Sequence, residues 1–156
     1  MSTNVRRFAC TPEELFAVFS DGWLFPLWVV GASRMRDVDD SWPAVGSRLH
    51  HSFGVWPALI DDETTLLEWE PSRRMVIQAA GWPIGEARVT LEARPVRGGC
   101  LVRIQEKPVK GPGILIPKPL LDVPLHVRNI ETLRRLAYVA EGRREIAWRP
   151  GATGVR

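Results

Sequence analysis

Two adjacent histidines, His50 and His51, are the residues whose type and spacing first suggest chemistry in this chain. They occur in the stretch LHHSFGVWP, which reads as the end of a strand. Consecutive side chains in a strand point to opposite faces, so the two imidazoles cannot hold one metal ion without a bulge. Leu49, His51 and Phe53 share the face that we expect to be the inner one, and His50 is expected to be solvated.

His51 is therefore the histidine that could act inside a cavity. A neutral imidazole there could accept or give a proton near neutral pH. The alternative is a core histidine that is hydrogen-bonded to a neighbour for structural reasons. His126 has no partner in an EXXH or HEXXH motif, so no metal site is predicted.

Glu106, on the last predicted strand, is the second candidate. It follows Val102 and Ile104 on the inward face. A carboxylate that faces an apolar cavity has a raised pKa unless it is paired, so Glu106 could be a general acid or base, or could bind a ligand hydroxyl. The alternative is a residue at the rim, near the strand end, that pairs with an arginine or lysine.

Asn129 is the third candidate, because it interrupts an apolar stripe. It lies between Leu125 and Leu133 in the pattern of the C-terminal helix. A polar group in such a stripe must find a partner, and the candidates are Glu106, His51 or a ligand. Its neighbour Arg128 is expected to flank the stripe, where its guanidinium could reach the mouth of a cavity.

Aromatic residues suggest what would line such a cavity. Seven tryptophans stand against one tyrosine, which fits either core and loop packing or an apolar cavity with aromatic walls. The acidic run Asp61–Glu63 is expected in a solvated turn or edge. The predicted ligand-binding residues are Trp28, His51, Phe53, Trp69, Trp82, Glu106, Leu125, Asn129 and Leu133, with His51 and Glu106 as the catalytic candidates.

Other functional classes leave no signal in the sequence. The formal charge of +3 comes without a dense basic block, which argues against nucleic-acid binding. No GxSxG, phosphate loop or dinucleotide fingerprint occurs, so no cofactor is expected. The longest apolar runs are too short to span a bilayer, and no signal peptide is evident. Cys10 and Cys100 are expected to be free thiols, and the protein is expected to be cytoplasmic.

The hydropathy pattern indicates the elements that must position these residues. Thr11 as N-cap, Pro12 at the first helical position and Glu14 as the third predict a helix over CTPEELFAVFSDG, with a second, short one in WLFPLWVVGAS. From Arg34 to Val109 the period changes to two, which predicts about six strands joined by short turns. A long helix follows, from about Lys118 to Gly142.

These elements predict one α+β domain over residues 1–143, with a flexible C-terminal tail over residues 144–156. An antiparallel sheet with one apolar face needs a cover, and the last helix supplies it. A strongly curved sheet around one helix leaves a space between them. The two short N-terminal helices can close that space at one end.

The order of elements and three stretches resemble the SRPBCC (START-like, Bet v 1-like) superfamily, and more narrowly its polyketide cyclase/dehydrase-like group. The stretches are VGSRLHHSFGVWPALIDDET, EWEPSRRMVIQAAGWPIGEARVTLE and NIETLRRLAYVAEG. The resemblance covers about Asn4 to Arg143. It implies the helix-grip fold, a curved antiparallel sheet of about seven strands around a long C-terminal helix, with an apolar tunnel between them. Catalytic residues vary across the superfamily, so the resemblance assigns none here.

Three functional hypotheses follow from this reading. The first is binding of a hydrophobic small molecule, lipid-like, polyketide or aromatic, in the internal tunnel. The second is a cyclase/dehydratase-like enzyme in which His51 and Glu106 are acid/base groups and Asn129 orients a carbonyl. The third is a partner protein that uses the aliphatic loop Gly111–Pro119, where Ile114, Leu115 and Ile116 could form a gate, a homodimer contact or a cap on the sheet end.

Overall fold

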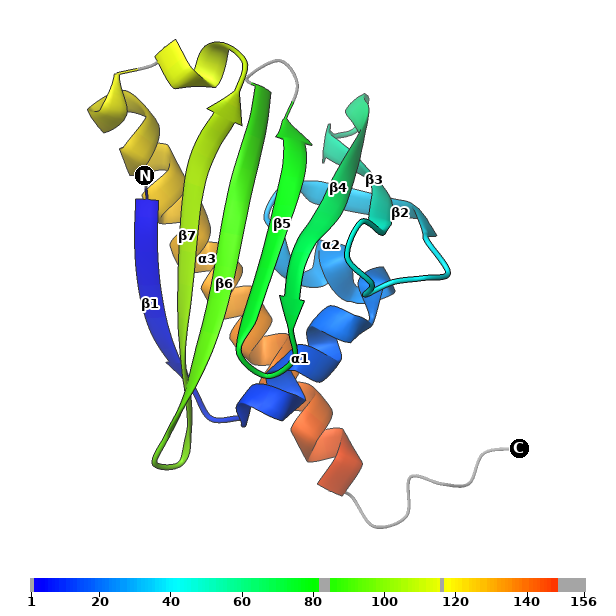
Figure 1. Ribbon diagram of the computed structural model, residues 1–156, viewed down its shortest axis with the longest axis vertical. Helices are drawn as coiled ribbons and strands as arrows, with labels where there is room; N and C mark the ends of the chain where they lie inside the picture. The colour runs from blue at the N-terminus through cyan, green and yellow to red at the C-terminus, as the bar shows by residue number, and fades with distance from the viewer. Residues whose placement is uncertain (1, 82–84, 116, 149–156) are drawn as a thin grey trace.

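The computed structural model describes residues 2–81, 85–115 and 117–148, and it has the predicted helix-grip fold (Figure 1). One curved sheet wraps around a long helix. The strands are β1 (Ser2–Phe8), β2 (Ala32–Val38), β3 (Arg48–Val55), β4 (Ala58–Glu70), β5 (Arg74–Gly81), β6 (Gly85–Val96) and β7 (Gly99–Lys110). The helical elements are α1 (Pro12–Ser20), η1 (Gly22–Leu24), α2 (Phe25–Trp28), η2 (Pro112–Leu115) and α3 (Lys118–Trp148).

The sheet is antiparallel throughout, with the strand order β1-β7-β6-β5-β4-β3-β2. Neighbours in sequence are neighbours in space from β2 to β7, as the short turns predicted. The exception is β1, which pairs with β7 so that Ser2 lies opposite Glu106 and Phe8 opposite Cys100. The first and last strands of the chain are therefore neighbours at one edge of the sheet.

Irregularities in strand pairing accompany the curvature of the sheet. Register shifts occur in β2, in β4 between Leu66 and Glu68, and in β7, where Val109 is skipped between the partners of Glu86 and Ala87. An extra residue in one strand bends that strand and increases its twist. The bent sheet turns its concave face toward α3, as Figure 1 shows.

Local sequence signals fix the start of α1. The side chain of Thr11 accepts a hydrogen bond from the backbone N–H of Glu14, and the Glu14 carboxylate accepts one from the N–H of Thr11. This is the predicted capping box, with Pro12 in the first turn. The helix buries Leu15, Phe16 and other apolar residues against the sheet, so it helps to close one end of the grip.

Helix α3 is longer than expected, because it continues to Trp148 rather than ending near Gly142. It contains Pro124, which has no N–H to donate to the carbonyl four residues earlier. Among the described residues, no helix is long and apolar enough to cross a membrane.

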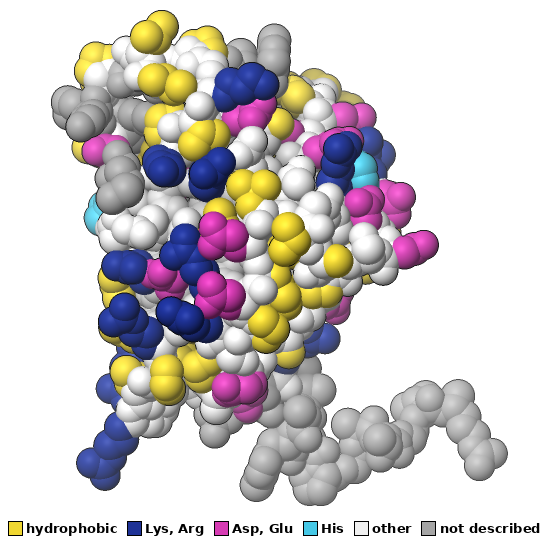
Figure 2. All heavy atoms as spheres, viewed as in Figure 1, with side chains coloured by type: hydrophobic (Ala, Val, Ile, Leu, Met, Phe, Trp, Pro, Cys, Tyr) yellow, Lys and Arg dark blue, Asp and Glu magenta, His cyan; other side chains and the backbone are white. Residues whose placement is uncertain are grey.

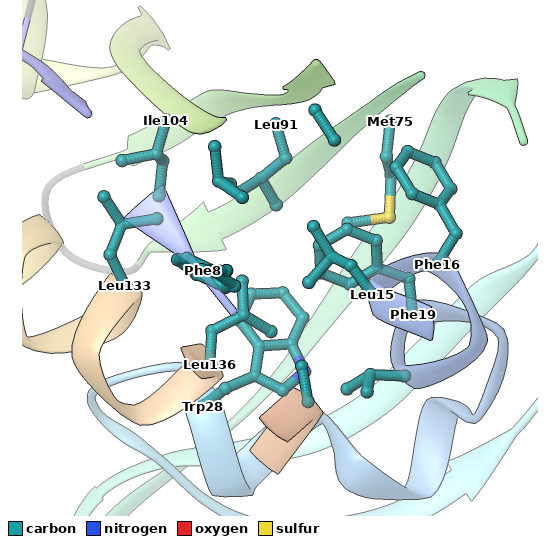
Figure 3. Packing of buried hydrophobic residues seen from close by; sticks show 14 of the residues in the cluster. Phe8, Leu15, Phe16, Phe19, Trp28, Met75, Leu91, Ile104, Leu133 and Leu136 are labelled. Atoms are coloured by element: carbon teal, nitrogen blue, oxygen red, sulfur yellow. The ribbon is translucent and has the colours of Figure 1, made fainter. Parts of the chain in front are cut away.

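The hydrophobic core lies between the sheet and the part of α3 that follows Asn129. In Figure 3, Leu133 and Leu136 of α3 face Ile104 and Leu91 of the sheet. Met75 from β5 and the aromatic rings of α1 fill the space beside them. Cys10 and Cys100 are also buried in this region, and both are free thiols.

The outer face of the sheet is covered by charges of both signs (Figure 2). Glu92 on β6 accepts hydrogen bonds from Arg74 on β5 at 2.9 Å and from the Nε of Arg103 on β7 at 2.8 Å. Arg74 also donates to Glu68 on β4 at 2.8 Å. Pairs of opposite charges on neighbouring strands stabilise a sheet modestly. Their presence is consistent with a solvent-exposed outer face.

Candidate functional site

A cavity of about 210 Å³ lies between the concave face of the sheet and α3. Its walls are mostly apolar and come from α2, the strands β3 to β7 and α3. The lining residues are Phe25, Trp28, Val29, His51, Phe53, Ile60, Asp62, Thr64, Ile77, Ala79, Ala80, Gly85, Glu86, Ala87, Val89, Ile104, Glu106, Pro108, Leu125, Arg128, Asn129 and Thr132.

Small side chains in one row of the sheet create this space. Ala79 on β5 lies opposite Ala87 on β6, and Ala87 lies opposite Pro108 on β7. The corresponding row deeper in the core holds Met75, Leu91 and Ile104. Protein interiors are otherwise packed with few voids larger than a water molecule, so a row of small residues leaves room for a guest.

One wall of the cavity carries an ion pair. Glu106 on β7 is 3% exposed, and its Oε1 accepts a hydrogen bond from the Nη2 of Arg128 on α3. The Arg128 side chain is 33% exposed, so this pair lies where the cavity approaches the surface. The second carboxylate oxygen of Glu106, Oε2, is buried and has no hydrogen-bond partner.

Asn129, the next residue on α3, also lines the cavity with an unused hydrogen-bonding atom. It is 1% exposed, and its Nδ2 is buried without a partner. Thr132, one turn further along the helix, is buried in the same wall. The polar interruption of the apolar stripe thus faces the cavity.

His51 lies on another wall, on β3. Its Nε2 is 2.9 Å from the Oγ1 of Thr64 on β4, and its ring centroid lies 5.0 Å from that of Phe25, with the two ring planes tilted by 34°. Burial lowers the pKa of His51 to about 4, and electrostatic interactions with Arg36 and His50 act in the same direction. The imidazole is therefore neutral near pH 7, and its Nδ1 has no partner.

Strand alternation separates the two adjacent histidines, as predicted. The ring of His50 points outward, where Nδ1 is 3.1 Å from Glu63 and Nε2 is 3.0 Å from Asp39. His50 is thus held between two carboxylates rather than freely solvated. Within the described residues, no group of three or more His, Cys, Asp or Glu could hold a metal ion.

The structure brings the three polar candidates to one cavity, where their free atoms His51 Nδ1, Glu106 Oε2 and Asn129 Nδ2 are not hydrogen-bonded to one another. Between His51 on β3 and Glu106 on β7 lie the strands β4, β5 and β6. Four strand spacings amount to about 19 Å measured along the sheet. In the part of the chain that the structure describes, no hydrogen bond joins His51 to Glu106 or Asn129; the partners of His51 and Glu106 are Thr64 and Arg128.

The other predicted ligand-binding residues fall in different places. Trp28, Phe53 and Leu125 line the cavity with the polar candidates. Trp69 and Leu133 do not: the Trp69 ring packs at 5.2 Å on Phe16, and Leu133 is buried in the core. Trp82 lies outside the described residues. Because none of these placements tests binding, the ligand-contact role of each residue stays a prediction.

Several cavity residues were missed from the sequence, and Asp62 is the clearest. The acidic run Asp61–Glu63 was expected in a solvated turn or edge; it lies within β4, where Asp61 and Glu63 are exposed as expected but Asp62 is partly buried. Asp62 pairs in register with His51 and lines the cavity, and burial raises its pKa. Pairing β3 with β4 in register would have shown that Asp62 shares the inward face with His51.

Comparison with known proteins agrees with this architecture. Residues 2–122 match the family described as polyketide cyclase / dehydrase and lipid transport. No curated protein sequence matches the chain.

Solved structures share the fold at low sequence identity. A Rhodobacter sphaeroides protein is 21% identical, with a TM-score of 0.67 and 90% of each chain covered. Ara h 8.0201 is 10% identical, with a TM-score of 0.69, covering 90% of this chain and 96% of its own. The di-domain ARO/CYC StfQ from the steffimycin biosynthetic pathway is 12% identical, with a TM-score of 0.71, covering 92% of this chain and 51% of its own.

At these identities the structural likeness shows the fold alone. The family match, however, spans most of the chain, from the first strand into the beginning of α3. The chain therefore belongs to the polyketide cyclase / dehydrase and lipid transport family.

Proposed function

We propose that the protein binds a hydrophobic small molecule, lipid-like, polyketide or aromatic, in the cavity between the sheet and α3. The observation that carries this proposal is the cavity of about 210 Å³ with mostly apolar walls and a few polar groups. Binding sites for small molecules have this composition, because apolar walls supply affinity and isolated polar groups fix orientation.

Uncharged N-phenyl-1-naphthylamine, whose fluorescence rises in apolar surroundings, provides a test. We expect saturable binding to the wild-type protein. Ala87→Phe should abolish it, because Ala87 lies in the row of small residues that creates the cavity. Ala17→Phe is the matched control, since Ala17 is exposed on α1, outside the cavity.

Circular dichroism shows whether each variant keeps its fold. Saturable binding that survives in a folded Ala87→Phe protein would contradict the assignment of the site. The absence of any saturable binding to the wild type would contradict the binding function itself.

The cyclase/dehydratase-like enzyme is a second candidate, favoured by one feature of His51. A neutral imidazole with a free Nδ1 beside an apolar cavity could take a proton from a bound substrate. Since His51 and Glu106 have separate hydrogen-bond partners, the substrate would have to span the cavity to meet both.

Conversion of a linear poly-β-keto thioester to a cyclic product would test this candidate. The enzyme function requires that His51→Gln and Glu106→Gln each lose turnover while both still bind the dye. Equal turnover in the two variants and the wild type would rule out these residues as the acid/base groups.

A further inference from the structure

Unused hydrogen-bonding capacity occurs on two adjoining elements of the cavity wall, at Glu106 on β7 and at Asn129, which follows the Glu106 partner Arg128 on α3. Glu106 Oε2 is an acceptor without a donor, and Asn129 Nδ2 is a donor without an acceptor. Both side chains are more than nine-tenths buried, and both residues line the cavity. Nearly all buried polar atoms in folded proteins have a partner, so two unpaired atoms of opposite kind at one binding site require an explanation.

The ion pair defines which part of Glu106 is available. Arg128 donates to Oε1, which leaves Oε2 as the free oxygen of the carboxylate. The same contact places a positive charge beside the negative one, so the ion pair as a whole is neutral. A ligand group next to it therefore meets hydrogen-bonding atoms without an excess of either charge.

We infer that the ligand of this cavity carries an uncharged hydroxyl group, phenolic or alcoholic, which donates to Glu106 Oε2 and accepts from Asn129 Nδ2. This inference rests on the proposed binding function and names its ligand class. A hydroxyl is suited to the two atoms because it has one donor and two acceptor lone pairs.

Other ligand groups cannot form hydrogen bonds with both Glu106 Oε2 and Asn129 Nδ2 without an energetic cost. A ligand carboxylate could accept from Asn129 but would face the Glu106 oxygen with a like charge. An ammonium group could donate to Glu106 but offers nothing to Asn129 and adds an uncompensated charge. A hydrocarbon leaves both atoms unpaired, and a site with unpaired polar groups rejects the analogue that cannot satisfy them.

Displacement of N-phenyl-1-naphthylamine by three molecules of similar shape tests the inference at pH 7. The competitors are 1-naphthol, naphthalene and 1-naphthoate. We expect 1-naphthol to displace the dye at a concentration about tenfold lower than naphthalene, because hydrogen bonds that include a charged partner discriminate by roughly that factor. We expect 1-naphthoate to be the weakest of the three.

Asn129→Leu removes the donor while keeping the size of the side chain. In this variant the advantage of 1-naphthol over naphthalene should fall to about threefold or less, while the dye still binds. Thr90→Val is the matched control, because it removes a hydroxyl from β6 at a position that does not line the cavity, and it should leave the advantage unchanged. Should Asn129→Leu fail to fold, Asn129→Ala allows the same comparison.

The outcomes separate this inference from the function on which it rests. Dye binding with equal displacement by 1-naphthol and naphthalene would overturn the hydroxyl assignment and leave the binding function standing. An advantage for 1-naphthol that persists in the folded Asn129 variant would also overturn it. If the wild type binds no dye, both proposals fail.

Discussion

The two ends of the space between the sheet and α3 have the same backbone architecture but opposite contents. In what we call the packed half, the inward residues Met75, Leu91 and Leu133 fill the volume. In the cavity half, the same strands present Ala79 and Ala87. The contrast shows that the helix-grip backbone does not by itself determine whether there is a cavity, because side-chain volume in a few rows decides it.

Polar side chains add to this contrast. Glu106, Asn129 and His51 all line the cavity half, and each has a buried atom without a hydrogen-bond partner. Burying polar groups costs stability unless they are paired, and several of these are only partly paired. The cavity half, where we propose that the ligand binds, is therefore the part of the molecule in which incompletely paired polar groups lower stability.

Replacement of the same residue type at two positions along α3, one facing each half, tests this comparison most strongly. Leu133→Ala removes a buried side chain from the packed half and should lower the free energy of unfolding by about 3 kcal/mol. Leu125→Ala, on the cavity wall, should cost about 1 kcal/mol, because that side chain is only partly buried and already borders a void. Urea unfolding of both variants measures the difference, and equal losses would contradict the division into halves.

His51 should make the cavity half sensitive to acid. Its pKa of about 4 in the folded protein lies below the 6.5 of an unperturbed histidine, so the unfolded chain binds more protons between these values. Stability should therefore fall as the pH drops from about 6.5 to 4, by about 3 kcal/mol in total.

Comparison with His51→Gln isolates this contribution, because the two proteins share all their other ionisable groups. The difference in their free energies of unfolding should change by about 3 kcal/mol between pH 7 and pH 4. A difference that stays constant over this range would show that His51 titrates normally.

Removing one member of the ion pair should destabilise the cavity half. Arg128→Met leaves the Glu106 carboxylate buried without its partner and should lower the free energy of unfolding by about 2 kcal/mol. The double variant Arg128→Met/Glu106→Leu should recover most of that loss, because no unpaired charge remains. Chemical unfolding of the single and double variants measures both values, and a double variant as unstable as the single one would contradict this account.

The smallest change in the free energy of unfolding is expected where a larger side chain extends into the cavity. Ala79→Leu adds volume to the cavity half and should change the free energy of unfolding by less than about 1 kcal/mol. Ala93→Leu adds the same volume to the packed half, where overpacking should cost about 2 kcal/mol. Thermal unfolding of the two variants compares them, and similar shifts in Tm would indicate equal packing at both ends.

Much of the fold could be predicted because its signals are local. The capping box at Thr11 fixed the start of α1, and the period of two placed His51 inside and His50 outside. The polar interruption at Asn129 also pointed to the cavity wall. Each of these depends on neighbours within a few residues along the chain.

The shape of the cavity could not be predicted in the same way. Alternation shows which face a residue occupies but not how far along the grip it lies, so Leu133 and Asn129 shared one predicted wall although only Asn129 lines the cavity. The row Ala79, Ala87 and Pro108 becomes visible only once the registers of β5, β6 and β7 are known. The long-range contact between Glu106 and Arg128 depends in the same way on how α3 crosses β7.

The pairing of β1 with β7 has a consequence for how the chain is made. Ser2 leaves the ribosome early but finds its partner strand only when Glu106 has been synthesised, and the helix that covers both follows later still. Contacts between residues so distant in sequence form slowly, because the closure of long loops opposes them. Until α3 emerges, the concave face of the nascent sheet is exposed to water, so the interval between the synthesis of β7 and that of α3 favours aggregation.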